Sequence, residues 1–254
     1  MAEGLTMNNA GTTGRNSQYV LVVGSDANSL IYTSMLLQRL EYHICSAKTA
    51  EEALELAGVA LPSLIITDLK LAGMSAPQMI KLLRQEPRTA SVPVVIKTEL
   101  LTPDLELKCL QAGAAASIKK PVQADELYRV VQSIIEHTPR THIRIQTRLF
   151  VTVNNKPLDC DAGECATVLS ARGMYIRTQN PFPRRTIFPL QITLDNQTIS
   201  AEAKVVYSHG QGEGPFGEAG MGLYFVKIDA LGEELLRKYI NEEVTKGITP
   251  SRPG

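Results

Sequence analysis

The chain has 254 residues with an apolar content of 44%, and 26 acidic residues balance 26 lysines and arginines. This length allows one or two domains with a buried core. A formal net charge of zero argues against broad electrostatic binding to nucleic acid or to an anionic membrane surface. No segment approaches the roughly 20 apolar residues of a membrane span, and no DNA-binding motif is present.

The first 17 residues lack the apolar core of a signal peptide and are expected to form a flexible tail. The four cysteines show neither CxxC spacing nor paired histidines nearby. We therefore expect a cytoplasmic protein with reduced thiols and no metal site.

Residues 18–137 alternate short apolar runs with amphipathic segments. The runs are YVLVV, HICSA, LIITD, VPVVIKT and ASIKK, each followed by a segment with helical periodicity. Strands that are buried on both faces have such uninterrupted runs, so we expect a parallel sheet with helices on both sides. Five strand–helix units predict a flavodoxin-like doubly wound α/β domain.

Three polar side chains stand at predicted strand ends in this half. The third strand ends at Asp68, the fourth ends at Thr98, and Lys120 follows the fifth. Ligand sites in doubly wound domains lie at the carboxyl ends of the parallel strands. A carboxylate can attack phosphorus, and a hydroxyl and an ammonium group can bind the phosphoryl oxygens. The three residues together predict a phosphoryl-acceptor site at this edge of the sheet.

These features resemble the response-regulator receiver domain over about residues 18–137. The resemblance implies that Asp68, in LIITDLKLAGMS, is the phosphoacceptor. It also implies that Thr98, in VPVVIKTEL, is the switch hydroxyl and that Lys120, in IKKP, is the lysine that precedes a proline.

The pair of metal-binding acids of that family is missing. Gly24 and Ser25 stand in their places, and Asp26 comes one position too late. Mg²⁺ takes oxygen ligands that usually include one or two carboxylates, so Asp68 alone leaves too little negative charge to hold it well. We expect a degenerate receiver without Mg²⁺, kept as a docking or dimerisation platform, in which Asp68 and Lys120 form an ion pair.

Residues 138–246 have a different pattern. Six segments alternate apolar and polar residues or are rich in β-branched residues: LFVTVN, ECATVLSA, GMYIRT, RTIFPLQITLD, TISAEAKVVYS and GMGLYFVKID. They predict a small antiparallel β-barrel. A helix over residues 230–246 follows, with Leu231, Leu235, Leu236, Tyr239 and Ile240 expected on one face. Residues 247–254 are expected to be a tail.

Arginines at positions 140, 144 and 148 precede the first predicted strand of this half, in a segment expected to be a flexible junction. A guanidinium group is a planar fork of donors that suits phosphate oxygens and the O6/N7 edge of guanine. Placed on a flexible junction, such groups can fold over a ligand that rests on the barrel.

With the strand order and the closing helix, these residues resemble a PilZ domain over about residues 139–246. That family binds c-di-GMP with an RxxxR pair before the first strand and a [DN]xSxxG motif at the end of the second. The resemblance implies that Arg140 and Arg144 form the pair, with Arg144 and Arg148 as the alternate register, and that Ser170 and Gly173 belong to the second motif. Val168 stands where Asp or Asn is expected, so the motif is partly degenerate.

The interpretation that follows is a non-enzymatic bacterial signalling protein of the two-component type. A pseudo-receiver is joined to a PilZ domain, and c-di-GMP binding at the junction changes the domain orientation and partner binding. One alternative is a ligand-independent adaptor for a protein partner, for example in motility or pilus regulation. The other is a phosphorylation-driven regulator that uses Asp68. The receiver resemblance also allows a homodimer.

Overall fold

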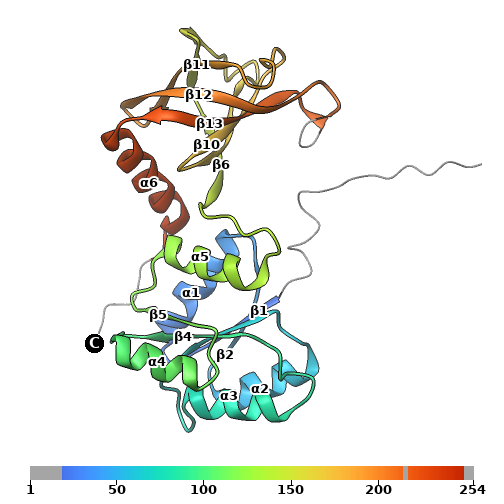
Figure 1. Ribbon diagram of the computed structural model, residues 1–254, viewed down its shortest axis with the longest axis vertical. Coiled ribbons are helices and arrows are strands. Elements are labelled where there is room, and N and C mark those ends of the chain that lie inside the picture. The colour runs from blue at the N-terminus through green and yellow to red at the C-terminus, as the bar shows by residue number, and fades with distance from the viewer. Residues whose placement is uncertain (1–18, 214–216, 249–254) are drawn as a thin grey trace, which may run out of the picture. The chain divides into compact units, whose positions relative to one another are not determined.

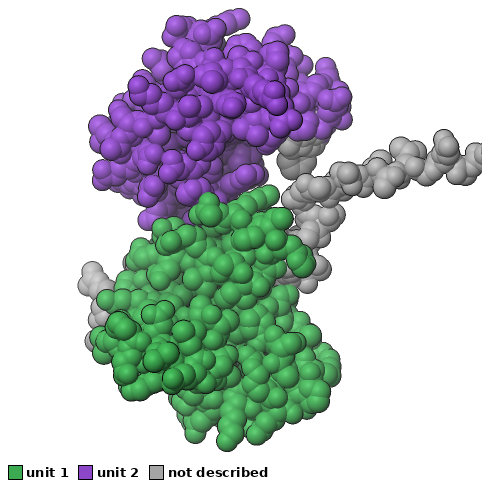
Figure 2. All heavy atoms as spheres, viewed as in Figure 1, with its two compact units in different colours: residues 1–141, 247–254 green, residues 142–246 purple. Residues whose placement is uncertain are grey.

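The structure of the protein is a computed structural model that describes residues 19–213 and 217–248 (Figure 1). One compact unit comprises the described residues up to Thr141 together with Gly247 and Ile248, and the other comprises His142–Lys246 (Figure 2). The predicted tail at 1–17 lies outside the described residues, as does the predicted tail at 247–254 apart from its first two residues. No helix among the described residues is both long and apolar enough to cross a bilayer.

The first unit is a five-stranded parallel sheet in the order β2-β1-β3-β4-β5, as expected for a flavodoxin-like doubly wound fold. Its strands are β1 (Tyr19–Val23), β2 (His43–Ala47), β3 (Leu64–Asp68), β4 (Val94–Thr98) and β5 (Ala116–Lys119). Its helices are α1 (Ala27–Arg39), α2 (Ala50–Val59), α3 (Ala76–Gln85), α4 (Pro103–Gln111) and α5 (Ala124–Ile135).

Burial of the sheet explains the apolar runs. All five residues of β3 and of β4 are buried, as are four of the five in β1, whereas the edge strands β2 and β5 are partly exposed. Helices cover both faces of the central strands, so each of these strands needs apolar side chains on both sides. Two charged side chains depart from this rule, because Lys97 in β4 is fully buried and Asp68 at the end of β3 is 4% exposed.

The second unit is a curled antiparallel sheet of eight strands in the order β6-β9-β10-β13-β12-β11-β7-β8, which agrees with the predicted barrel (Figure 1). The strands are β6 (Arg144–Leu149), β7 (Val151–Val153), β8 (Lys156–Pro157), β9 (Cys165–Ser170), β10 (Gly173–Arg177), β11 (Ile187–Leu194), β12 (Gln197–His209) and β13 (Gly220–Ile228). The helix α6 (Ala230–Thr245) follows them.

The structure corrects the expectation for the segment that carries the arginines. Residues from Arg144 onward were expected to be a flexible junction, but Arg144–Leu149 form the strand β6, paired with β9. Exposed residues alternate in β6 with half-buried ones, which is typical of a strand with one covered face. Polar residues stand at every second position of β6, so this segment contains no apolar run that would have predicted a strand.

The buried face of α6 also differs from the prediction. Leu236 and Ile240 are buried as expected, but Leu231 is 65% exposed. Gly232 and Val244 are buried instead. The helix begins directly after Asp229, whose carboxylate accepts a hydrogen bond from the Gly232 backbone N–H. This cap places Leu231 in the first turn, outside the covered stripe.

Candidate functional site

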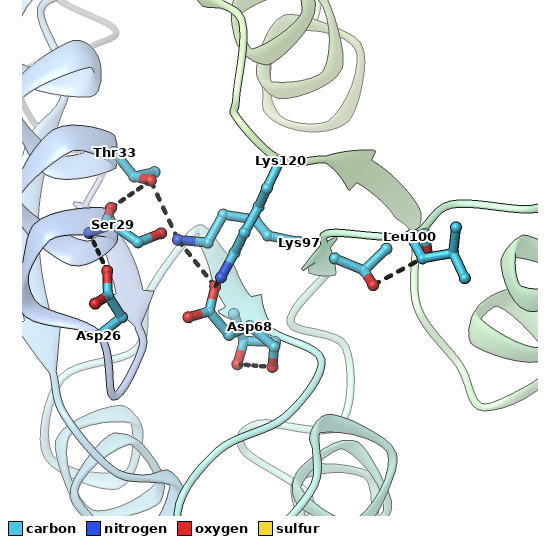
Figure 3. Close-up of polar contacts among 9 residues, drawn as sticks. Asp26, Ser29, Thr33, Asp68, Lys97, Leu100 and Lys120 are labelled. Carbon is cyan, nitrogen blue, oxygen red and sulfur yellow. Dashed lines mark hydrogen bonds and ion pairs between the residues drawn. The ribbon is translucent and has the colours of Figure 1, made fainter. Parts of the chain in front are cut away.

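The carboxyl ends of β3, β4 and β5 carry the polar residues that the sequence predicted (Figure 3). Asp68 is the last residue of β3, Thr98 is the last residue of β4, and Lys120 directly follows β5. Lys120 Nζ lies 3.0 Å from Asp68 Oδ1, so the expected ion pair is present. Asp68 is only 4% exposed, which places this pair in a largely desolvated setting.

A second lysine, absent from the predicted site, reaches the same carboxylate. Lys97 Nζ lies 3.3 Å from Asp68 Oδ1 and donates a hydrogen bond of 3.1 Å to Thr33 Oγ1 of α1 (Figure 3). The Thr33 hydroxyl in turn donates to the backbone oxygen of Ser29. Burial lowers the pKa of Lys97 below its usual value, and the charge of Asp68 opposes this effect. Two ammonium groups thus converge on one carboxylate.

Two other polar side chains near this edge, Asp26 and Thr98, form local hydrogen bonds with the backbone. Asp26 Oδ1 accepts a hydrogen bond of 2.6 Å from the Ser29 backbone N–H, so this carboxylate is the N-cap of α1. The Thr98 hydroxyl donates to the Leu100 backbone oxygen over 3.2 Å. Neither the remaining acid nor the hydroxyl is paired with Asp68 in this arrangement.

Gly24 makes room for the Asp68 carboxylate. A Cβ atom placed at position 24 would lie 2.8 Å from Asp68 Oδ2, closer than non-bonded atoms approach. Any side chain at this position therefore requires Asp68 to move. Among the described residues, no cluster of three or more His, Cys, Asp or Glu side chains is placed to hold a metal ion.

The second unit brings three of the predicted ligand residues into one row. Arg144 in β6 is the direct cross-strand partner of Ser170 in β9, and Ser170 is the partner of Gly173 in β10. Residues directly opposite each other on neighbouring strands project to the same face of a sheet. The adjacent row contains Leu169 and Met174, which are buried, so the row with Arg144 is on the outward face.

Ser170 and Gly173 also have structural roles. The Ser170 hydroxyl donates a hydrogen bond of 2.9 Å to the Gly173 backbone oxygen, which closes the turn between β9 and β10. A Cβ atom at position 173 would overlap the backbone oxygen of Leu223 in β13. The glycine therefore allows β10 and β13 to approach closely, whether or not a ligand is bound.

The three arginines are placed differently. Arg140 belongs to the first unit, where its backbone N–H donates to Gln132 Oε1 of α5 over 2.8 Å. Arg148 donates a hydrogen bond of 2.7 Å from Nη2 to the Cys160 backbone oxygen, and Asp161 Oδ1 is 3.7 Å away. Arg144 is exposed, and its guanidinium makes no contact of this kind with the described residues.

Comparison with known families agrees with both geometries. Residues 20–132 match the family model of the response regulator receiver domain, and residues 136–242 match that of the PilZ domain. The chain carries a receiver domain followed by a PilZ domain. Both families are regulatory, and their combination indicates a bacterial signal-transduction protein.

Individual relatives cover the receiver half. Histidine kinase P4 of Formosa agariphila is 26% identical over 140 residues, which are 55% of this chain and 10% of the kinase. Two-component response regulator ORR6 of Oryza sativa is 27% identical over 127 residues, 49% of this chain and 75% of that protein. The crystal structure of a putative response regulator from Chloroflexus aurantiacus is 27% identical, with a TM-score of 0.45, and covers 46% of this chain and 97% of its own. The chain thus spans only a tenth of the kinase.

Proposed function

We propose that the PilZ domain binds c-di-GMP on the outward face of its sheet and that the receiver is a pseudo-receiver that signals without Mg²⁺ or phosphorylation. The observation that carries the proposal is the row formed by Arg144, Ser170 and Gly173. These residues come from three neighbouring strands and are paired in one row, in which Arg144 is exposed, Ser170 is half-buried and Gly173 is buried.

The chemistry of this row suits a cyclic dinucleotide. The free guanidinium of Arg144 can bind phosphate oxygens or the O6/N7 edge of guanine in a bidentate manner. The Ser170 hydroxyl donates to Gly173, and its oxygen can still accept a hydrogen bond from a ligand. Arg140, which precedes the unit boundary in the chain, is proposed as the second phosphate contact. Arg148 is the alternative to Arg140 in this role.

The pseudo-receiver proposal is supported by the charges around Asp68. One carboxylate faces two ammonium groups, so the site already has an excess of positive charge before any ion arrives. Two unit charges 4 Å apart repel by about 4 kcal/mol at an effective dielectric constant of 20. A divalent cation beside Lys97 and Lys120 would meet that repulsion, and among the described residues Asp68 is the acid that pairs with both lysines. These donors do not match the ligand set that Mg²⁺ prefers.

Isothermal titration of the full chain with c-di-GMP tests the ligand proposal. We expect saturable binding to the wild type and a loss of at least about tenfold in affinity for Arg144→Ala, because charge-assisted hydrogen bonds contribute about 1.5–3 kcal/mol each. Arg184→Ala, which removes an exposed arginine from a loop of the same unit, is the matched control. Absence of heat with the wild type at high micromolar ligand would refute the proposal.

A ligand-independent adaptor is the second candidate. Val168 favours it, because a half-buried valine stands where the motif has an acid or amide. An adaptor would bind a protein partner, such as a component of a motility or pilus system, equally well with and without nucleotide. A pull-down with an identified partner in both conditions separates the two candidates.

Four further expectations remain predictions of the proposal. Ligand binding is expected to change the orientation of the two domains, which X-ray scattering with and without c-di-GMP would detect. A homodimer through the receiver is testable by sedimentation. The absence of enzymatic activity and a cytoplasmic location also remain predictions.

A further inference from the structure

Val168 has a polar neighbour directly opposite on the next strand. Gln146 in β6 pairs with Val168 in β9, within a regular stretch in which Ile145 pairs with Leu169. The side chains of such directly opposed residues lie about 4.5–5.5 Å apart at Cβ and share one face. Leu169 is completely buried, so Gln146 and Val168 project to the opposite, outward face. This is the same face that carries Arg144 and Ser170.

The Gln146 side chain is available for a ligand. It is exposed, and its amide makes no hydrogen bond with the described residues. On its own strand it stands two residues from Arg144, and therefore on the same side. Across the strand it is diagonal to Ser170. Three polar groups thus border the methyl groups of Val168.

The carboxamide of glutamine matches the edge of a guanine base. Guanine presents N–H donors at N1 and N2 beside the acceptor O6. A glutamine Oε1 can accept from those donors, and its Nε2 can donate to O6. An aspartate at position 168 could only accept. The glutamine side chain is also one methylene longer than asparagine, which helps it to reach over the neighbouring strand.

Val168 then has a complementary role. Its half-buried side chain is flanked on the other side by Tyr175 of β10, which is 6% exposed. The ring of Tyr175 is covered and packs against Tyr207, so Val168 itself provides the apolar surface on which the plane of a base can rest. Compared with the motif, the polar contact comes from Gln146 on β6, and position 168 on β9 provides an apolar surface instead. Both residues project to the outward face.

We propose that Gln146 is a specificity-determining residue for a guanine nucleotide and supplies, from β6, the base-edge contact that position 168 lacks. The inference rests on the proposed binding of c-di-GMP by this face. It assigns a ligand contact to a residue outside both short motifs of the domain.

A double-mutant cycle in the full chain tests this assignment, with c-di-GMP and c-di-AMP as the probes. We expect Gln146→Ala to weaken c-di-GMP binding by about 5- to 100-fold, since an unpaired polar group on the base is then buried. The same substitution should change c-di-AMP binding much less. In a Val168→Asp background, Gln146→Ala should lose most of its effect, because the acid takes over the contact. Gln191→Ala, an exposed glutamine of β11, is the control and should leave binding unchanged.

The outcomes separate this inference from the proposed function. If the wild type binds c-di-GMP and Gln146→Ala binds equally well, the role of Gln146 is refuted and the proposed function stands. If Gln146→Ala weakens binding equally in both backgrounds, Gln146 does not substitute for position 168, and the inference is again overturned. If the wild type binds neither dinucleotide, both proposals fail. Circular dichroism of each variant confirms that the fold is intact before titration.

Discussion

Lys97 Nζ lies 3.3 Å from Asp68 Oδ1, and the lysine side chain has no exposure to solvent. A fully buried ammonium group is rare unless it is paired, because removing it from water carries a large free-energy penalty. Here the pair is completed by the hydroxyl of Thr33 on the helix that covers this face of the sheet.

The first prediction concerns the packing of the lysine stem. Lys97→Ala should lower the free energy of unfolding of the receiver by about 2–4 kcal/mol, because it leaves a cavity and removes one partner of Asp68. Lys97→Met, which keeps most of the volume, should stay within about 1 kcal/mol of the wild type, since Lys120 still pairs with Asp68. Urea unfolding followed by circular dichroism measures both, and Lys81→Ala, at an exposed position of α3, is the control. Equal losses for Ala and Met would contradict the volume argument.

The second prediction is a dependence of stability on pH. Burial lowers the pKa of Lys97 in the folded state below its usual value of 10.5. Between the lowered pKa and 10.5 the unfolded chain binds more protons than the folded one, so stability must rise with pH in this window. The stability of the wild type relative to Lys97→Met should therefore increase as the pH approaches 10.5. Comparison with Lys97→Met removes the contributions of titrating groups that do not interact with Lys97, and a difference that stays flat or falls would show that burial does not lower the pKa of Lys97.

The third prediction concerns phosphorylation. Acetyl phosphate with Mg²⁺ should leave Asp68 unmodified, because its carboxylate is held by Lys97 and Lys120 and the Asp26 carboxylate caps α1. Intact-mass measurement checks this, with a receiver domain that has both metal-binding acids as the positive control. A phosphoryl adduct on the wild type that disappears in Asp68→Asn would show that the receiver is active after all.

The fourth prediction separates the two registers of the arginine pair. Arg148→Ala should reduce c-di-GMP affinity far less than Arg144→Ala, because the Arg148 guanidinium is hydrogen-bonded to the Cys160 backbone oxygen. It should instead lower the stability of the PilZ domain by about 1–3 kcal/mol, since it leaves that oxygen without its charged donor. Thermal unfolding and titration of the two variants side by side give the answer. Loss of affinity in Arg148→Ala with unchanged stability would favour the alternate register.

Much of the fold follows from local pattern. The runs VLVV and LIIT predict buried strands because only a sheet covered on both faces needs such sequences. Asp68 and Thr98 could be placed at the rim for the same reason, since Asp68 directly follows LIIT and Thr98 ends the run VPVVIKT. The order of the apolar segments along the sequence therefore predicts both the parallel sheet and the residues at its carboxyl edge.

The contacts of the site could not be predicted in this way. Lys97 stands in the run VPVVIKT, one place before Thr98, and nothing local shows that its ammonium turns inward. Its partner Thr33 is 64 residues away on a helix. The row that unites Arg144 with Ser170 depends on the register between β6 and β9, and the long connection between these strands does not fix that register.

The space at Gly24 limits which residues this position can hold. A substitution that places an acid there would push a carboxylate against the carboxylate of Asp68, while the ammonium of Lys97 still fills the neighbouring interior. The residue that follows β1 and the last residue of β3 are therefore coupled by packing, and a side chain at position 24 requires the Asp68 carboxylate to take another position.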